Sequence, residues 1–325
     1  MIKAVPPATS RFTRITRVSW QVTREALRAH ADLHHFHDVE LIPAGLVLRV
    51  LGKKVVYDVH EDYPRRGIFL RRVPGLGWQP LGWILERIEG IAARCFSAIV
   101  TVVPAIDQRF SRHNPRTVMV QNFPSAVELQ DVSQEDWGER SSAVAYVGQI
   151  STIRGVRQMV QAMEMVPGRL NATLELAGAF TPSTDPQPIM ALPGWKRVRY
   201  AGSADRNQVR RILGQVRAGL AILLPYPNHE HAVPTKLYEY MAAGIPVIAS
   251  DFAHLRKIVA GANCGLLVNP LDPKAIASAI EYILSCPQEA HAMGQRGRAA
   301  VETQYNWESE QAKLLDLYRV LGEDV

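Results

Sequence analysis

The second half of the chain alternates short apolar runs with longer segments in which apolar residues recur every three or four positions. Six runs have the length of buried strands: AVAYVG, ATLELAGA, RVRYAG, AGLAILLP, PVIAS and CGLLVNP. Helical periodicity is found near residues 155–166, 205–217, 235–243, 253–260 and 273–285. Strands that are apolar on both faces and alternate with helices predict a parallel, doubly wound sheet. Such sheets bind ligands at the carboxyl ends of their strands.

The first half shows the same alternation in a shorter form. Its strand candidates are DLHHFHD, KKVVYDVH, SAIVTVV and TVMVQN, and its helix candidates are AGLVLRVLG, ILERIEGIAARCF and AIDQRFSRH. A helical pattern from Trp20 to His30 precedes the first strand, although a right-handed crossover normally begins from a strand. We therefore expect a second Rossmann-like α/β domain that is reduced by the loss of its opening β/α units.

The domain boundaries follow from residues 125–141, which are polar, acidic and without a hydrophobic period. This segment is predicted to be a linker between an acceptor-side domain at 1–124 and a C-terminal domain at 142–302. The tail, 303–325, contains an amphipathic helix from Trp307 to Leu321 that we expect to pack back toward the first domain.

Composition and charge narrow the class of protein. With 47% hydrophobic and 21% charged residues, the chain is globular rather than disordered. Its three cysteines have no CxxC spacing, and no run reaches the ~18 apolar residues of a spanning helix, so we expect a cytoplasmic protein. Residues 1–124 hold 18 Lys and Arg against 10 Asp and Glu, a net charge of +8. This excess favours an anionic partner surface, with a merely solvated basic face as the alternative.

The sequence PTKLYEYMAAGIPVIASD, residues 234–251, predicts a short helix followed by a strand. Pro234 and Thr235 suit a helix start, with Thr235 as the capping residue, and Gly244 suits its end. The free N–H groups of a helix start attract anions, and Lys236 adds a positive charge. Glu239 has two interpretations: it complements the helix dipole, or it binds a ligand at this end of the helix.

A second anion-binding candidate is the strand–turn–helix sequence AYVGQISTIRGVRQMVQAM. Gly148 and Gly155 flank a six-residue loop that contains Arg154, and glycine lets the backbone approach a ligand closely. The glycine spacing excludes the dinucleotide-binding and P-loop fingerprints. An ordinary turn between a strand and a helix is the alternative interpretation.

These two motifs, followed by GLLVNPLDPKAIASAI, resemble the C-terminal donor domain of retaining GT-B glycosyltransferases. The similarity is strongest to the large bacterial family that builds cell-surface polysaccharides and glycolipids. HFHDVELIPAGLVLRVLGKKVVYDVHEDYP is similar to the N-terminal domain of one branch of that family. The resemblance covers nearly the whole chain from about Trp20 onward. It implies two Rossmann-like domains and a glycosyl transferase that uses a nucleotide-sugar.

The resemblance also implies which residues bind the donor phosphates. The glycine turn, with Gly148, Gln149 and Arg154, holds the diphosphate together with Thr235 and Lys236. Gln149 stands where the family usually has an arginine, which removes one phosphate partner. Fixed positive groups then stabilise the departing nucleoside diphosphate. Because no Asp-x-Asp sequence occurs in the chain, we expect transfer without a metal cofactor.

A pair of glutamates separated by seven residues holds the sugar and the ribose in the resembled family. Glu239 matches the second, ribose-binding glutamate. The position of the first is His231, with Glu230 beside it. The resemblance therefore implies a sugar contact from Glu230 or His231, and the sequence leaves both open.

His60, in VVYDVHED, ends a predicted strand and faces the expected crevice. The resemblance implies that His60 lies near the transferred sugar and acts as an orienting residue or a weak acid or base. A structural histidine that hydrogen-bonds a loop is the alternative.

The run HHFHDVE offers a different interpretation, the metal site of a hydrolase. His35 and His37 lie on one face of a predicted strand. Further ligands considered for such a site are Asp38, Glu40, His60, Glu61 and Asp62. The two-residue period of a strand places His35 and His37 but does not place these further ligands. The chain also lacks the eight βα units of a barrel, so the sequence favours a glycosyl transferase over a metal-dependent hydrolase.

The segment PRRGIFLRRVPGLGWQP, residues 64–80, mixes arginines with large apolar side chains. The candidate membrane or acceptor patch consists of Arg65, Arg66, Phe69, Arg71, Arg72 and Trp78. Such a mixture suits an anionic membrane surface. A loop that partly closes the acceptor cleft is the alternative, and no nucleic-acid-binding motif accompanies the charge.

The sequence therefore predicts an enzyme that moves a sugar from a UDP- or GDP-linked donor to a glycan or lipid-linked acceptor. We expect it at the inner face of the cytoplasmic membrane. A nucleotide-sugar epimerase or hydrolase of the same architecture, and an inactive scaffold subunit that binds a nucleotide-sugar, are the alternatives.

Overall fold

The computed structural model describes residues 5, 13–62, 78–125, 137–226, 229 and 233–323. The chain forms two compact units. The first consists of Met1–Asn122 together with Glu310–Val325, and the second of Phe123–Ser309. The first unit is therefore discontinuous in sequence, and the division falls just before the segment predicted to be a linker.

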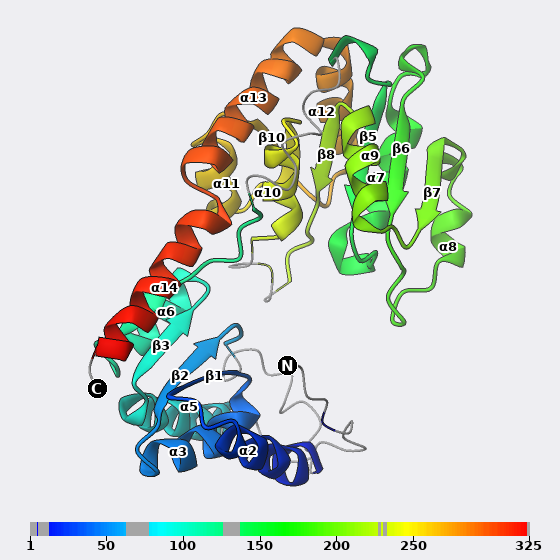
Figure 1. Ribbon diagram of the computed structural model, residues 1–325. Coiled ribbons are helices and arrows are strands. Elements are labelled where there is room, and N and C mark those ends of the chain that lie inside the picture. Colours follow the sequence, from blue (N-terminus) through cyan, green and yellow to red (C-terminus); the bar gives the residue numbers. More distant parts are fainter. Residues whose placement is uncertain are drawn as a thin grey trace. The chain divides into compact units, whose positions relative to one another are not determined.

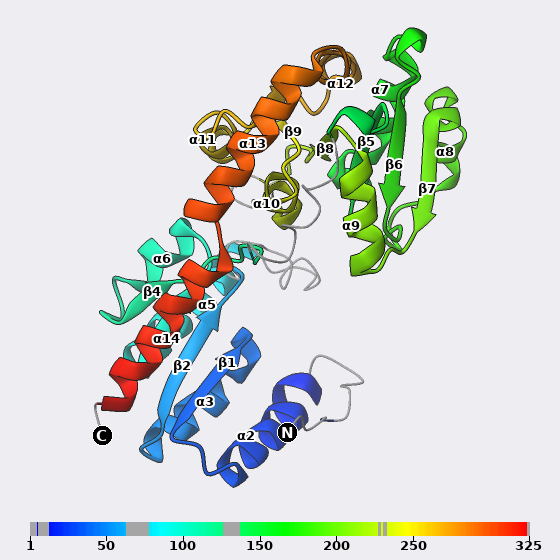
Figure 2. The same ribbon diagram turned by 45° about the horizontal axis from the view of Figure 1, so that its top comes forward.

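The first unit is built on a four-stranded parallel sheet (Figures 1 and 2). Its strands follow in chain order as β1 (Leu33–His37), β2 (Lys54–Val59), β3 (Ala98–Thr101) and β4 (Thr117–Met119). Its helices are α2 (Ser19–Arg28), α3 (Ile42–Val50), α5 (Trp78–Cys95), α6 (Pro104–Phe110) and most of α14 (Trp307–Glu323). Nearly all residues of β2 and β3 are buried, which explains why these strands are apolar without alternation.

The C-terminal helix α14 contributes buried contacts to the first unit. The buried carboxylate of Glu310 accepts a hydrogen bond from the backbone N–H of Gln121 at 3.0 Å. The ammonium of Lys54 donates to the carbonyl of Leu321. The hydroxyl of Tyr318 lies 2.5 Å from Nδ1 of His35 in β1.

The second unit is built on a six-stranded parallel sheet in the order β10-β9-β8-β5-β6-β7. The strands are β5 (Ala143–Val147), β6 (Thr173–Ala177), β7 (Val198–Gly202), β8 (Ala218–Ala221), β9 (Val247–Ser250) and β10 (Gly265–Val268). The chain winds outward from β5 to β7, returns to β8 beside β5, and winds outward again to β10. The strand order therefore reverses between β5 and β8.

Helices cover both faces of this sheet, as the alternation of strands and helices predicts. They are α7 (Val156–Met165), α8 (Gln187–Met190), α9 (Arg206–Gln215), α10 (Thr235–Ala242), α11 (Ala253–Val259), α12 (Pro273–Ser285) and α13 (Pro287–Thr303). Val144 and Tyr146 of β5 pack with α7 and α12 on one face. Ala143, Ala145 and Val147 pack with α9, α10 and α11 on the other.

Helix α13 was not predicted from the sequence. Its two interior glycines, Gly294 and Gly297, are poor helix formers. In the fold they allow close packing, because a Cβ at Gly294 would lie 2.1 Å from the carbonyl oxygen of Gly244. Tertiary packing thus overrides the local preference against a helix.

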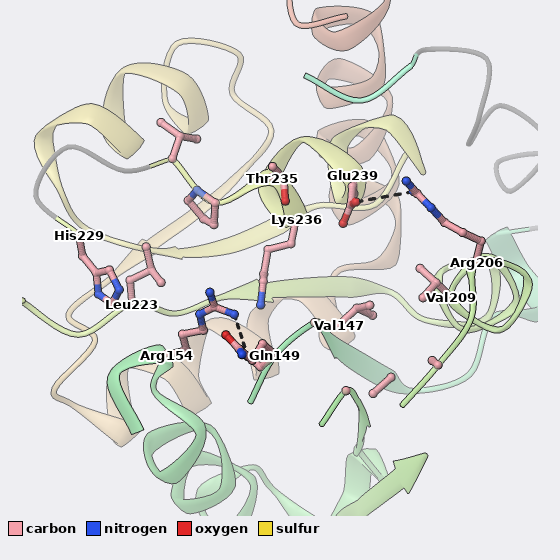
Figure 3. Close-up of a pocket in the computed structure, with 16 residues that line it drawn as sticks. Val147, Gln149, Arg154, Arg206, Val209, Leu223, His229, Thr235, Lys236 and Glu239 are labelled. Carbon is pink, nitrogen blue, oxygen red and sulfur yellow. Dashed lines mark hydrogen bonds and ion pairs between the residues drawn. The ribbon is translucent and has the colours of Figure 1, made fainter. Parts of the chain in front are cut away.

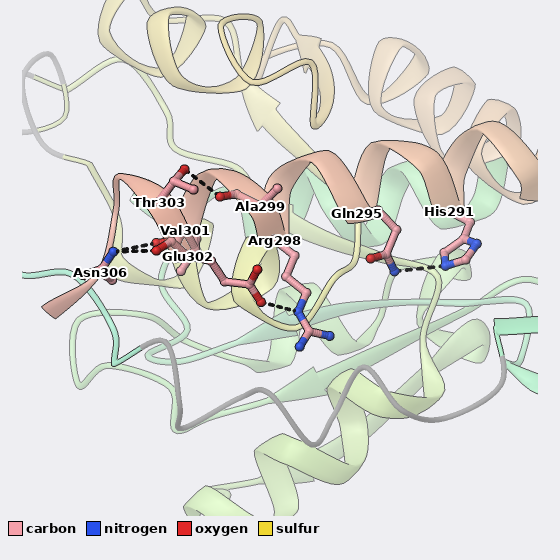
Figure 4. A network of polar contacts seen from close by, with 8 residues as sticks. All are labelled: His291, Gln295, Arg298, Ala299, Val301, Glu302, Thr303 and Asn306. Atoms are coloured by element: carbon pink, nitrogen blue, oxygen red, sulfur yellow. Dashed lines mark hydrogen bonds and ion pairs between the residues drawn. The ribbon is translucent and has the colours of Figure 1, made fainter. Parts of the chain in front are cut away.

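A single buried amide links the end of α13 to the start of α14 (Figure 4). Nδ2 of Asn306 donates to the carbonyls of Val301 and Glu302 at 3.0 and 3.1 Å. Its Oδ1 accepts from the backbone N–H of Ser309 at 2.8 Å. Asn306 therefore satisfies backbone groups at both helix ends. Across the described part of the chain, no helix combines the length and hydropathy needed to span a bilayer.

Candidate functional site

The candidate site lies where the strand order of the second sheet reverses, at the carboxyl ends of β5 and β8. Segments that follow these strands, together with the start of α10 and the first residues of α9, line a cavity of about 550 Å³ (Figure 3). This is the position at which doubly wound sheets bind ligands. The predicted donor-site residues that line it are Gly148, Gln149, Arg154, Thr235, Lys236 and Glu239.

Gly178 brings the turns after β5 and β6 together at the cavity wall. Its φ is +145°, and a Cβ at this position would lie 2.0 Å from the carbonyl oxygen of Gly148. The N–H of Gly148 donates to the carbonyl of Ala177 at 2.9 Å. Only glycine fits at position 178, so this part of the wall is bare backbone that a ligand can approach.

Lys236 places a buried positive charge in the cavity wall. The residue lies in the first turn of α10 and is 8% exposed. Nζ lies 3.4 Å from the centroid of the Tyr146 ring, and it has no hydrogen-bond partner among the described residues. Burial lowers the pKa of Lys236 well below its usual value; Arg154 lowers it further and Glu239 opposes the shift. An unsatisfied buried amine of this kind favours an anionic ligand.

Arg154 supplies a second positive group beside Lys236 (Figure 3). It ends the 3-10 turn Thr152–Arg154 that leads into α7. Its Nη1 donates to the carbonyl of Gln149 at 3.1 Å, and the hydroxyl of Tyr146 donates to the same oxygen at 2.7 Å. Burial raises the pKa of Tyr146 to about 12, so this hydroxyl keeps its proton at neutral pH.

Glu239 lies in the second turn of α10, with its carboxylate facing the guanidinium of Arg206 (Figure 3). Oε1 of Glu239 and Nη1 of Arg206 are 4.0 Å apart. The effect of a helix dipole falls off within the first turn, so dipole capping does not account for Glu239. The expectation that Thr235 caps this helix is wrong: extended Pro234 occupies the N-cap position, and Thr235 is the first helical residue.

Two buried hydroxyl groups fix the backbone around the cavity. The hydroxyl of Tyr240 accepts a hydrogen bond from the N–H of Val147 at 3.0 Å, which ties α10 to the end of β5. Ser250 Oγ accepts from the N–H of Leu223 and donates to its carbonyl, both at 2.8 Å. The cavity wall is therefore held before any ligand binds.

Among the polar side chains that line the cavity, two were not predicted from the sequence, Arg206 and His229. Arg206 opens α9 next to Asp205, whose side chain forms a capping box with Gln208. That capping box was the available indication, because it fixes where α9 begins. His229 is buried, and its Nδ1 lies 2.9 Å from the carbonyl oxygen of Leu224. Nothing in its local sequence separates His229 from its neighbour His231.

A polar cluster lies at the carboxyl ends of β1 and β2 in the first unit. Asp58 Oδ2 lies 3.2 Å from one imidazole nitrogen of each of His35, His37 and His60. Burial alone would raise the pKa of Asp58, but hydrogen bonds from His35 and His60 lower it to about 2. The same hydrogen bond raises the pKa of His60, and burial opposes that shift. A cavity of about 210 Å³ adjoins His37, Asp58 and His60.

Several predicted site residues lie outside the described residues. These are Glu230 and His231 of the donor site and Arg65, Arg66, Phe69, Arg71 and Arg72 of the membrane or acceptor patch. Trp78 is the first residue of α5, and its side chain is also outside the described part. The roles assigned to these residues stay predictions.

Comparison with known proteins relates the chain to one family. Residues 129–300 match the family described as glycosyl transferases group 1. A D-inositol 3-phosphate glycosyltransferase of Xylanimonas cellulosilytica is 27% identical over 184 residues, which are 55% of this chain and 42% of that protein. The O-antigen chain mannosyltransferase B of Escherichia coli is 24% identical over 180 residues, 54% of this chain and 45% of that protein. The chain thus spans less than half the length of these relatives.

Solved structures share the fold over nearly the whole chain. Sucrose-phosphate synthase from Thermosynechococcus elongatus has a TM-score of 0.72 at 20% identity, covering 98% of this chain and 81% of that one. HepE from Anabaena, in a complex with UDP, has a TM-score of 0.71 at 14% identity, covering 94% and 83%. The predicted GT-B fold, with two parallel-sheet α/β domains, is confirmed.

Proposed function

Because the chain belongs to the glycosyl transferase group 1 family, we propose that it transfers a sugar from a nucleotide-sugar to an acceptor hydroxyl. The observation that carries this proposal is the Lys236 amine, which is buried in the cavity wall without a hydrogen-bond partner among the described residues. A diphosphate supplies the missing acceptor oxygens. The presence of UDP in the Anabaena HepE structure supports a nucleoside diphosphate as the ligand.

Positive side chains in the cavity suit the departure of a nucleoside diphosphate. When the sugar leaves, negative charge grows on the phosphate oxygen that held it, and fixed cations near that oxygen lower the barrier. Lys236 and Arg154 provide these cations, and the free N–H groups at the start of α10 add to them.

We propose that this step needs no metal in the donor cavity. Mg²⁺ in phosphate sites is held by one or two carboxylates together with the phosphates. Glu239 is the sole carboxylate among the described residues that line the cavity, and it faces Arg206. Glu239 is therefore better suited to accept hydrogen bonds from the ribose hydroxyls, since a carboxylate accepts from two donors at once.

We assign the acceptor side of the reaction to the first unit. His60 follows β2, adjoins a cavity and is held by Asp58 at 3.2 Å, an arrangement that suits a residue orienting a sugar hydroxyl. Retention of the anomeric configuration is part of the proposal and rests on the family resemblance. Changing His60→Asn is expected to lower kcat by about 10²-fold. UDP binding should stay unchanged, because every described residue that lines the donor cavity belongs to the second unit.

An exposed apolar face on α5 supports an anionic membrane surface as partner. Trp83, Ile88 and Ile91 are 58, 50 and 60% exposed, and the guanidinium of Arg87 lies 5.0 Å from the Trp83 ring. A helix that exposes aromatic and aliphatic side chains beside arginines such as Arg87 and Arg94 suits an interface with anionic lipids. A lipid-linked or glycan acceptor in cell-surface synthesis, at the inner face of the cytoplasmic membrane, is consistent with that surface.

Flotation with vesicles tests the membrane part of the proposal. The Trp83→Ala/Ile91→Ala variant should float less than the wild type with phosphatidylglycerol vesicles. Leu315→Ala, which removes an exposed leucine of α14, should float like the wild type. Equal flotation of all three proteins would reject the α5 surface.

Thermal shift with a panel of nucleotides and product analysis test the central proposal. A ligand that binds the folded protein raises its stability by RT ln(1 + [L]/Kd). The thermal shifts with UDP, GDP, ADP and their sugars, at equal concentration, therefore rank these donors by affinity. Product analysis with and without a glycan acceptor then separates transfer from hydrolysis or epimerisation of the donor. The absence of a shift with every nucleotide would overturn the donor-site assignment.

A further inference from the structure

We propose that His35, His37 and Asp58 of the first unit form a binding site for one divalent transition-metal ion of the zinc class. One ligand atom from each of the three residues lies within 4.8 Å of the others. Two imidazoles and a carboxylate are the ligand types that zinc uses in catalytic sites, where a fourth position stays open. The site is separate from the donor cavity, which consists of residues of the second unit.

The pairing of β1 and β2 presets these ligands. The strands are parallel, with His35 opposite Val56 and His37 opposite Asp58. Side chains alternate between the two faces of a strand, so His35 and His37 point to one face of the sheet. Asp58, the cross-strand neighbour of His37, points to the same face, as its contacts with both rings show. Rigid backbone therefore holds all three ligands.

Two distances within the cluster are close to the edge length of a metal tetrahedron. Asp58 Oδ2 lies 3.2 Å from Nε2 of His35 and 3.2 Å from Nδ1 of His37. Zinc binds nitrogen and oxygen at about 2.0–2.2 Å, which separates neighbouring ligands of a tetrahedral site by about 3.4 Å. The two Asp58 distances are within a few tenths of an ångström of this value, and all three ligand atoms lie within 4.8 Å of one another.

An unsatisfied buried oxygen in the cluster points to a missing cation. Asp58 is 8% exposed, and its second oxygen, Oδ1, is buried without a hydrogen-bond partner among the described residues. The other oxygen, Oδ2, has two lone pairs, so the three imidazoles around it cannot all donate a well-formed hydrogen bond to it. A metal ion would neutralise the carboxylate and bind the imidazoles through their lone pairs.

Tyr318 provides the outer contact that metal-binding histidines usually have. Its hydroxyl lies 2.5 Å from Nδ1 of His35, while Nε2 of the same ring faces Asp58. A ring that binds metal through Nε2 carries its proton on Nδ1 and donates it to an outer acceptor. The open coordination position would face the cavity of about 210 Å³ beside His37 and His60, where it could take a water or hydroxyl oxygen.

Metal titration of the full chain tests this assignment. Protein freed of metal with a chelator is titrated with Zn²⁺ by calorimetry and with Co²⁺ by visible absorption, which reports coordination geometry. We expect one equivalent to bind with a tetrahedral Co²⁺ spectrum. Tyr318→Phe should weaken binding by roughly 10–100-fold, and His37→Gln should weaken it further. The His37 side chain is 58% exposed, so this variant is expected to fold, which circular dichroism checks.

The matched control is His34→Gln. His34 immediately precedes the proposed ligand His35, but it is paired with Val55 and points to the opposite face of the strand. The His34→Gln variant should therefore bind metal with the affinity of the wild type. Equal affinity of His37→Gln and the wild type, or no stoichiometric binding by the wild type, would overturn the proposal and leave a hydrogen-bonded cluster. UDP binding in the same preparations reports separately on the donor cavity.

Discussion

The ammonium nitrogen of Lys236 lies 3.4 Å from the ring centroid of Tyr146, whose hydroxyl turns away to the carbonyl of Gln149. The face of an aromatic ring thus meets the buried charge where a salt bridge would otherwise be expected. An arriving anion need not displace an internal partner of Lys236 among the described residues. The interaction of Lys236 with the anion therefore contributes to the binding free energy without first having to offset the loss of an internal hydrogen bond.

Lys236→Met should stabilise the free protein while weakening nucleotide binding. Removing a buried polar group that lacks a partner is expected to raise the free energy of unfolding by about 1–3 kcal/mol. Loss of a charged hydrogen-bond donor to the diphosphate should weaken UDP binding by roughly 10–150-fold. Denaturant unfolding and calorimetry measure the two effects. Lys274→Met, at an exposed position of α12, should change neither.

UDP binding should weaken at alkaline pH and take up protons. Burial keeps the pKa of Lys236 in the free protein well below 10.5, with Arg154 contributing, and a bound diphosphate would raise it again. At a pH between the pKa of the free protein and that of the complex, UDP binding adds a proton to Lys236. The affinity for UDP therefore falls as the pH rises through the lowered pKa of the free protein. Calorimetry in buffers of different ionisation enthalpy measures the uptake. Lys236→Met should show none above pH 8, where the phosphates are already ionised.

The stability of the free protein should respond to pH in the opposite direction. Since the folded pKa of Lys236 lies below the unfolded value of 10.5, the unfolded chain binds more protons between them. The contribution of Lys236 to the free energy of unfolding therefore increases with pH across that window. Comparing denaturant midpoints of the wild type and Lys236→Met isolates this contribution; parallel pH profiles would contradict it.

Glu239→Gln should discriminate between UDP and inorganic pyrophosphate. If Glu239 holds the ribose, the amide weakens UDP binding by roughly 10-fold or more, because hydrogen bonds to a charged group contribute about 1.5–3 kcal/mol. Pyrophosphate, which has no ribose, should bind as it does to the wild type. Glu164→Gln, at an exposed position of α7, serves as the control. Equal loss for both ligands would mean that Glu239 acts on the phosphate site.

Gly178→Ala should damage both stability and nucleotide binding. The added Cβ would meet the carbonyl oxygen of Gly148 at 2.0 Å, so the turn after β5 must move. We expect a loss of about 1–3 kcal/mol in unfolding free energy, together with weaker UDP binding. Gly202→Ala also has a positive φ, of +67°, but its Cβ would have no neighbour within 4 Å. This control should cost stability through backbone strain and leave UDP binding intact.

The strand and helix order was predictable because burial on both faces leaves a strong record in the sequence. AVAYVG and PVIAS are almost entirely apolar, and the structure places both at interior positions of a parallel sheet, between two neighbouring strands. Helix α13 was missed because the reason for Gly294 is the Gly244 backbone, which lies far away in sequence. Contacts of this kind leave no local periodicity.

The candidate site was predictable in its backbone and less so in its side-chain partners. Glycines and a helix start indicated where Lys236 and Arg154 lie. The ion pair of Glu239 with Arg206 joins two separate helices, and no motif records it. The cluster around Asp58 likewise depends on the register of β1 and β2, which the sequence leaves undetermined. Spacing along one strand could suggest His35 and His37, but not their third partner.

The discontinuity of the first unit sets the order in which the protein can be completed during synthesis. Its sheet is made first, yet Gln121, Lys54 and His35 find partners on Glu310, Leu321 and Tyr318, which are translated after the whole second unit. The second unit, by contrast, is complete once Ser309 has emerged. Domains generally fold as units, so the half that is translated first must wait for its final helix.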